Sequence, residues 1–152
     1  MNHVEYAYTT GMDDESVEQR LRTADSGVLA LATGNDAYAI PLAHYYDGDG
    51  LYFRLGLTEG GTKRTFLEST ETACYVLYGA DPTNDPKAFD SWSIVVSGRL
   101  TDLTEADRQR FDTAEINDCF SPIRVFDEAI EDIEVTVRKL DIERISGRTT
   151  EN

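Results

Sequence analysis

The stretch Leu51-Tyr-Phe-Arg-Leu-Gly-Leu-Thr-Glu-Gly-Gly-Thr-Lys-Arg-Thr-Phe-Leu67 passes from a strand through a glycine-containing loop into a helix. Leu51, Phe53 and Leu55 alternate with Tyr52 and Arg54, and this period of two is typical of a half-buried strand. The first part of the stretch therefore predicts one strand of a sheet, with an apolar inner face and a more polar outer face.

The second part predicts an anion site at the start of the helix. A pair of glycines permits close backbone approach, and Thr62 is expected to cap a helix that opens with Lys63 and Arg64. The first turn of a helix carries unpaired N–H groups and favours anions, whereas basic residues usually lie at the other end. A bound phosphate would explain the two cations. The alternative is a solvated helix face on which they pair with Glu59 or Glu68.

The other strands are predicted from short apolar runs between turn signals. These runs cover residues 27–33, 38–46, 72–78, 92–100 and 135–142, and an Asp-Gly-Asp-Gly hairpin turn precedes residue 51. Gly98 is expected at a bulge or a close backbone contact, and a one-residue slip between Val137 and Leu140 predicts a bulge in the last strand.

Pro41 restricts the position of the second strand. Proline has no N–H to donate to a ladder, so the strand over residues 38–46 is expected at a sheet edge or at a bulge. Its unpaired backbone groups would then be available to a ligand. The alternative is that Pro41 only protects an edge from aggregation.

The whole pattern predicts a mainly β (α+β) fold. Six strands joined mostly by hairpins, with helices at 13–24, after Thr62, at 104–113 and at 123–133, fit an antiparallel barrel with peripheral helices. At 152 residues the chain is expected to form one domain, with residues 1–12 as an N-terminal arm and residues 79–90 as a loop. A doubly wound α/β fold would need a helix after every strand.

Composition excludes some classes of partner. The net charge is −15 and the sequence pI is about 4.3, so neither a nucleic acid nor an anionic membrane surface is an expected partner. No signal peptide or membrane-spanning run is evident, which predicts a cytoplasmic protein. Dispersed acids with few lysines are typical of a salt-rich cytoplasm such as that of haloarchaea.

Few residues suggest acid–base, metal or thiol chemistry. His3 and His44 stand alone, so surface or core positions are expected for them and no metal site is predicted. Cys74 and Cys119 are expected to be reduced and buried, although one disulfide remains an alternative. No catalytic acid, base or nucleophile is assigned.

An ordered set of local strings resembles the pyridoxamine 5′-phosphate oxidase-like family of FMN-binding split barrels. The strings are Gly27-Val-Leu-Ala-Leu-Ala-Thr, Tyr38-Ala-Ile-Pro, Leu51-Tyr-Phe-Arg, Thr62-Lys, Val95-Val-Ser-Gly-Arg and Ile145-Ser-Gly-Arg. The resemblance covers about residues 13–148 and implies a six-stranded antiparallel split β-barrel that forms a homodimer, with FMN in the groove between the subunits.

By position, the resemblance also implies a set of cofactor-binding residues. Main-chain groups of Ala39, Ile40, Pro41 and Leu42 would lie along the isoalloxazine edge. The phosphate would be held by Arg54, Thr62, Lys63 and Arg64, and Trp92 would reach the flavin of the partner subunit. For Arg54 the alternative is a cross-strand ion pair, and for Trp92 it is a place in the core or the dimer interface.

Two departures from the family pattern matter. Relatives often carry serine or histidine just after the third strand, whereas here Gly56 and its leucine neighbours offer only backbone. The extended C-terminal segment of the true oxidases is also missing, so oxidation of pyridoxamine phosphate is not expected.

The resemblance therefore implies an FMN-binding oxidoreductase that transfers hydride or electrons to a small molecule. Such a protein needs few acid–base residues, because the cofactor carries out the chemistry. One alternative is a non-catalytic dimeric module that binds a flavin or another phosphorylated ligand. Relatives that bind the deazaflavin F420 or heme are a further alternative.

Overall fold

The computed structural model describes residues 9–58, 60–82, 89–111 and 133–150. Its elements in chain order are β1 (Thr10–Gly11), α1 (Asp14–Thr23), β2 (Ser26–Thr33), β3 (Asp36–Tyr46), β4 (Gly50–Thr58), α2 (Thr62–Ser69), β5 (Thr72–Pro82), β6 (Phe89–Thr101), α3 (Glu105–Phe111) and β7 (Ile133–Thr149).

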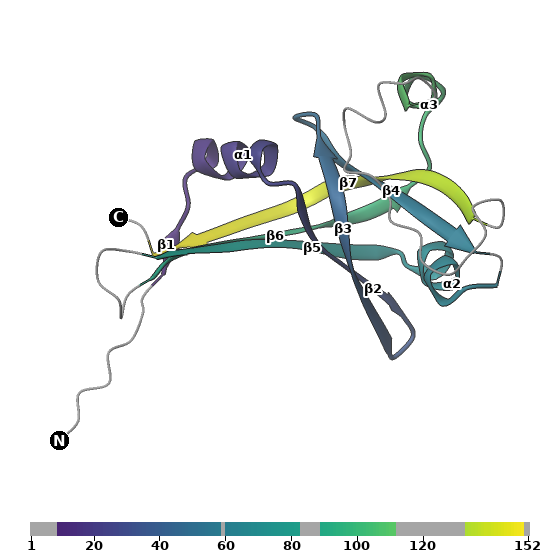
Figure 1. Cartoon of the computed structure of the whole chain (residues 1–152), viewed down its shortest axis with the longest axis horizontal. Helices are drawn as coiled ribbons and strands as arrows, with labels where there is room; N and C mark the ends of the chain where they lie inside the picture. The colour runs from purple at the N-terminus through teal and green to yellow at the C-terminus, as the bar shows by residue number, and fades with distance from the viewer. Residues whose placement is uncertain (1–8, 59, 83–88, 112–132, 151–152) are drawn as a thin grey trace.

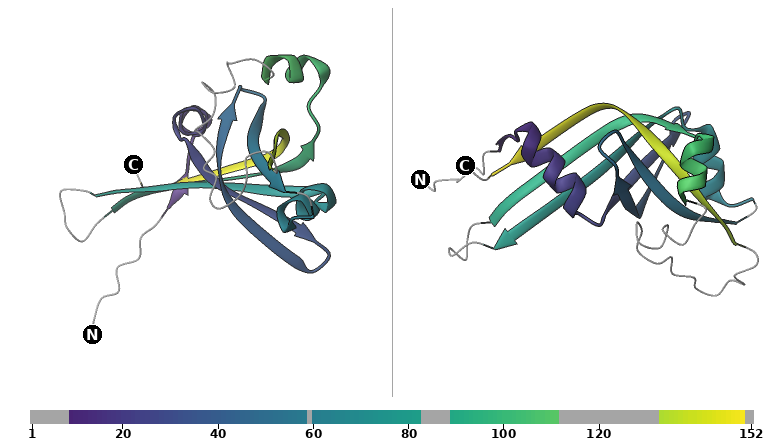
Figure 2. Two further views of the ribbon diagram at one scale, coloured as in Figure 1. Left: turned by 45° about the vertical axis from the view of Figure 1, so that its right-hand side comes forward. Right: turned by 90° about the horizontal axis from the view of Figure 1, so that it is seen from above.

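The strands form one antiparallel sheet that closes on itself. Their order is β1-β7-β4-β3-β2-β5-β6, and an additional pairing of β7 with β6 closes the ring of the six longer strands. Figure 1 shows β5, β6 and β7 side by side along the molecule, with α1 near one end and α2 at the other. In Figure 2, α1 lies over the extended ends of these strands. The predicted antiparallel barrel with peripheral helices is confirmed.

Three predicted boundaries are wrong. The N-terminal arm contains β1, which pairs with the end of β7 through Thr10 and Gly11. Both ends of the predicted loop 79–90 belong to strands, because β5 continues to Pro82 and β6 begins at Phe89. The helix predicted at 123–133 extends too far, because Ile133 begins β7, where it pairs with Thr58 of β4. The rest of the helix predicted at 123–133 lies outside the described residues.

The barrel interior follows the period-two alternation of the strands. Leu51, Phe53 and Leu55 of β4 are each no more than 1% exposed and belong to the main core. Between them, Tyr52 faces outward and packs with Phe111 of α3 in a second small cluster. The alternation predicted for residues 51–55 is thus confirmed, and α3 covers part of the outer side of β4.

The sheet contains a bulge between β6 and β7. Ser97 pairs with Arg144 and Gly98 pairs with Ile142, so Glu143 is an extra residue in β7. A Cβ atom at position 98 would clash with the main-chain carbonyl oxygen of Asp141. The bulge predicted at Gly98 is confirmed. The bulge predicted between Val137 and Leu140 is wrong, because the pairing of β7 with β4 is continuous there.

The outer face of the sheet carries an uncharged surface that we call the outer patch. Its residues alternate with core residues and are cross-strand neighbours of one another on β3, β2, β5 and β6. They are Val28, Ala30, Ala39, Pro41, Cys74, Val76, Tyr78, Ser93, Val95 and Ser97. Tyr78 is 74% exposed and Val95 is 38% exposed. No helix among the described residues has the length and apolar character needed to cross a membrane.

Candidate functional site

The first feature of the candidate site is an open edge on β3. Residues 26–33 of β2 pair with residues 36–43 of β3, but β4 pairs only with His44, Tyr45 and Tyr46. In the described part of the chain no strand covers the other side of residues 36–43. The barrel is therefore split between β3 and β4, and the edge position predicted for Pro41 is confirmed.

Hydrogen-bond alternation shows which backbone groups face this open edge. The His44 N–H donates to the Asp25 carbonyl at 3.3 Å, so the main-chain groups of His44 face β2. Since neighbouring residues of a strand face opposite sides, Leu42 and Ile40 also face β2. Ala39 and Pro41 face the open edge, and the missing N–H of Pro41 costs no bond to β2. Among the four predicted flavin-edge residues, Ala39 and Pro41 thus have the accessible main chain.

The second feature is the start of α2, which lies against β4. The Lys63 ammonium donates to the Gly56 carbonyl oxygen at 3.2 Å. Gly61 is the N-cap and has no side-chain cap, and the first turn contains no acidic residue. An ammonium has three N–H donors, so one bond to Gly56 leaves donors for an anion. The arrangement suits a phosphate at the helix start.

The other three predicted phosphate residues occupy different environments. Thr62 is the first residue of α2 and is exposed, so the prediction that it caps the helix is wrong. The cap position falls one residue earlier. Arg64 lies 3.9 Å from Glu68, as the ion-pair alternative proposed. Arg54 is half-buried on the outer side of β4. Gly56, two residues later in the same strand, faces the same side.

Two contacts that the sequence did not indicate fix α2 beside the split. The rings of Tyr38 on β3 and Phe66 on α2 stack with centroids 5.2 Å apart. At the other end of α2, the Thr70 hydroxyl donates to the Phe66 carbonyl at 2.5 Å and accepts from the Ala32 N–H at 3.2 Å. These contacts join α2 to the strands β3 and β2 and depend on tertiary packing, so no local signal in the sequence would have revealed them.

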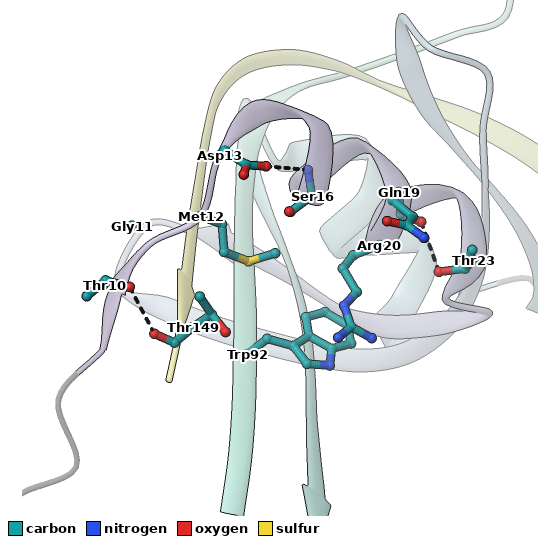
Figure 3. Close-up of a pocket in the computed structure, with 10 residues that line it drawn as sticks. All are labelled: Thr10, Gly11, Met12, Asp13, Ser16, Gln19, Arg20, Thr23, Trp92 and Thr149. Carbon is teal, nitrogen blue, oxygen red and sulfur yellow. Dashed lines mark hydrogen bonds between the residues drawn. The ribbon is translucent and has the colours of Figure 1, made fainter. Parts of the chain in front are cut away.

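Trp92 lies away from this group, near the end of the sheet that carries β1. It pairs with Gly79 and Thr149 and faces α1, where the Arg20 guanidinium lies 4.7 Å from the ring centroid. Both side chains line a cavity of about 520 Å³, and Figure 3 shows them with the other residues around it. The cavity is lined by Thr10, Gly11, Met12, Asp13, Ser16, Gln19, Arg20, Thr23, Trp92 and Thr149. Within one chain the structure therefore separates Trp92 from the residues around Lys63.

The comparisons with known proteins agree with this architecture. A family model described as pyridoxamine 5′-phosphate oxidase matches residues 13–149. The chain belongs to this family. No curated protein sequence matches the chain significantly.

Several solved structures share the family fold. A FAD-binding protein from Mesorhizobium loti is 20% identical, with a TM-score of 0.68, and the match covers 93% of this chain and 97% of that one. A putative 5-nitroimidazole antibiotic resistance protein from Bacteroides thetaiotaomicron is 17% identical, with a TM-score of 0.65 and coverage of 98% and 96%. A FAD and heme binding protein from Mycobacterium smegmatis is 16% identical, with a TM-score of 0.64 and coverage of 95% and 74%. At these identities the likeness concerns the fold.

Proposed function

We propose that this pyridoxamine 5′-phosphate oxidase family member binds a flavin, FMN, at the split between β3 and β4 and acts as an oxidoreductase on a small molecule. The observation that carries the proposal is the Lys63 ammonium at an uncapped helix start, beside a strand edge with accessible backbone groups. The ammonium at the helix start suits a phosphate, and the backbone groups of the strand edge suit the polar edge of a planar ring.

In this proposal the chain's own residues bind and orient the cofactor. Lys63 and the first N–H groups of α2, including that of Thr62, hold the phosphate, and Arg54 adds positive charge from β4. Ala39 and Pro41 offer main-chain groups to the ring. The bound flavin supplies hydride or electron transfer, which explains why no catalytic acid or nucleophile is needed.

We also propose that two copies of the chain associate through the outer patch. None of its ten residues is charged, although the chain as a whole has a net charge of −15. An exposed apolar surface that lacks charge is typical of a protein interface, and a second copy carries the same uncharged surface. Ala39 and Pro41 belong to the patch and to the open edge, so the second copy would border the flavin.

FAD and F420 are alternative ligands for the proposed site, since each carries phosphate as FMN does. The structurally similar proteins from Mesorhizobium loti and Mycobacterium smegmatis are described as binding FAD, and the latter also heme. FAD would place a pyrophosphate where FMN has its phosphate, and the deazaflavin F420 also carries a phosphate. A dimeric module that holds such a ligand without turnover is the second candidate, since the described residues assign no acid–base group to the split.

An absorption spectrum tests the proposal directly. The purified protein is mixed with FMN in several molar KCl, the excess is removed, and the retained ligand is extracted and identified by mass. Twin flavin bands that stay with the protein and bleach on addition of NADH or NADPH would support an oxidoreductase. Retained flavin that does not bleach with any reductant would favour the binding module, and no retained flavin would contradict the proposed cofactor.

A further inference from the structure

Three hydrogen-bond contacts, two of them buried and one part-buried, connect α1 with the strand that carries the proposed flavin edge. His44 Nε2 lies 3.0 Å from the Leu21 carbonyl oxygen of α1, and His44 Nδ1 lies 2.9 Å from the Tyr75 hydroxyl oxygen. The same hydroxyl oxygen lies 2.9 Å from the Leu42 carbonyl oxygen, a second acceptor for the single Tyr75 proton. His44 is 5% exposed and Tyr75 is fully buried, so water does not compete for the two His44 contacts, whereas the Tyr75–Leu42 contact is part-buried.

The absence of a side chain at Gly27 creates this arrangement. Gly27 is the β2 partner of Leu42, and a Cβ atom there would lie 2.8 Å from Cζ of Tyr75. Tyr75 belongs to β5, on the far side of β2, and its ring reaches β3 by passing over Gly27. A hydrogen bond from the Gly27 N–H also acts on the Tyr75 hydroxyl and lowers its pKa, although burial has the larger, opposite effect.

The number of protons in the three contacts depends on the charge of His44. The Leu21 and Leu42 carbonyls only accept, a neutral imidazole has one N–H, and Tyr75 has one O–H. Because Nε2 faces the Leu21 carbonyl, the neutral ring carries its proton there and Nδ1 can only accept. Two protons then serve three contacts, and the Tyr75 hydroxyl cannot donate to His44 and Leu42 at once. In the imidazolium both ring nitrogens donate, to Leu21 and to Tyr75, and the Tyr75 proton is then committed to Leu42.

The surroundings keep the imidazole neutral at ordinary pH. Burial lowers the pKa of His44, while the hydrogen bond to Leu21 and the charge of Asp25 raise it by less. The elements packed around the ring contribute Leu21 from α1, Phe53 from β4 and Tyr75 from β5, of which only Tyr75 titrates. The ring therefore takes up its second proton only below its ordinary pKa of 6.5.

We propose that His44 is a positioning residue that couples proton uptake to the flavin-facing strand, because protonation commits the Tyr75 hydroxyl to the Leu42 carbonyl. The link to flavin rests on the proposed function, whereas the proton coupling itself does not. The Leu42 carbonyl faces β2, but Leu42 directly follows Pro41, which faces the open edge. Fixing this carbonyl therefore restricts Pro41 before a ligand binds, so that less conformational freedom is lost on binding. Lowering the pH then strengthens flavin binding through His44, a residue that does not contact the ligand.

Nuclear magnetic resonance tests the coupling without any ligand. Labelling leucine carbonyl carbons and alanine nitrogens selects the Leu-Ala peptides, which are Leu29-Ala30, Leu31-Ala32 and Leu42-Ala43. The Leu42 carbonyl shift is expected to change with the same midpoint as the His44 ring between pH 8 and pH 4.5, while the other two peptides stay flat. In Tyr75→Phe the His44 ring should still titrate without moving the Leu42 signal. A Leu42 signal that is flat through the His44 midpoint, or a ring that never titrates in the wild type, would overturn the proposal.

Binding of FMN at pH 7.5 and pH 5.5 in several molar KCl tests the consequence. The wild type is expected to gain about three- to tenfold more affinity on acidification than His44→Gln, whose amide donates and accepts but cannot take up a proton. Equal gains in the two proteins would overturn the link to the flavin edge. If FMN binds at neither pH while the Leu42 shift follows His44, the proposed cofactor fails and the proton coupling stands.

Discussion

The substitution Gly98→Ala tests the closure of the barrel at the bulge between β6 and β7. A Cβ atom at position 98 would clash with the carbonyl oxygen of Asp141, and it would lie 2.8 Å from the carbonyl carbon of Asp141 and 3.2 Å from the Glu143 nitrogen. All three are backbone atoms, so no side chain can rotate to make room. The strand β7 must move away from β6 at this point.

The size of the effect follows from this geometry. Overpacking of a tight site costs about 1–3 kcal/mol, and a clash with backbone belongs at the upper end of that range. For a protein of this length each kcal/mol lowers the melting temperature by about 2–4 °C. Gly98→Ala should therefore melt about 6–12 °C below the wild type.

The assay is thermal unfolding in several molar KCl, followed by circular dichroism. Gly11→Ala is the matched control, because a Cβ atom at position 11 meets no atom within 4 Å. The control should melt close to the wild type. Equal melting temperatures for Gly98→Ala and Gly11→Ala would refute the close approach of β6 and β7 and with it the bulge at Glu143.

Three further predictions concern the interface, the charge and the buried histidine. Val95→Arg places a charge in the outer patch and should convert the proposed dimer to a monomer in light scattering. Val135→Arg is the control, because position 135 is 55% exposed and lies outside the patch, and this variant should stay dimeric. A monomeric wild type would contradict the interface. With a net charge of −15, the melting temperature should rise steeply with added KCl, and a salt-independent value would contradict salt adaptation. Because burial lowers the pKa of His44, the unfolded chain binds more protons as the pH falls below 6.5, so stability should fall there. The fall should be smaller in His44→Gln, and identical pH profiles of melting temperature would show that His44 contributes nothing to it.

The sequence was most informative where one residue type has one structural consequence. The apolar alternation at Leu51, Phe53 and Leu55 predicts a buried face because a strand has a side-chain period of two. Pro41 predicts an edge because it has no N–H, and the structure places it on the open side of β3. Gly98 predicts a close contact because it has no Cβ.

Features set by distant parts of the chain could not be predicted in this way. Ile133 fits a helical period, yet pairing with Thr58 draws it into β7. The contact of Lys63 with Gly56 needs α2 to fold back on β4, and neighbouring residues do not specify that. The placement of Trp92 beneath Arg20 follows from the packing of α1 over the far end of the sheet, so position along the strand alone did not indicate its surroundings.

The most direct test of the central claim compares the affinities of FMN and riboflavin, which differ only in the phosphate. The wild type should bind FMN more tightly, and Lys63→Met should lose about 10- to 100-fold in FMN affinity with little change for riboflavin. Lys139→Met is the control, since it makes the same change in net charge at a lysine that lies 3.5 Å from Asp141. A selective loss in Lys63→Met would establish a phosphate site at the start of α2. Equal effects of the two variants, or equal affinities of the wild type for FMN and riboflavin, would contradict the account.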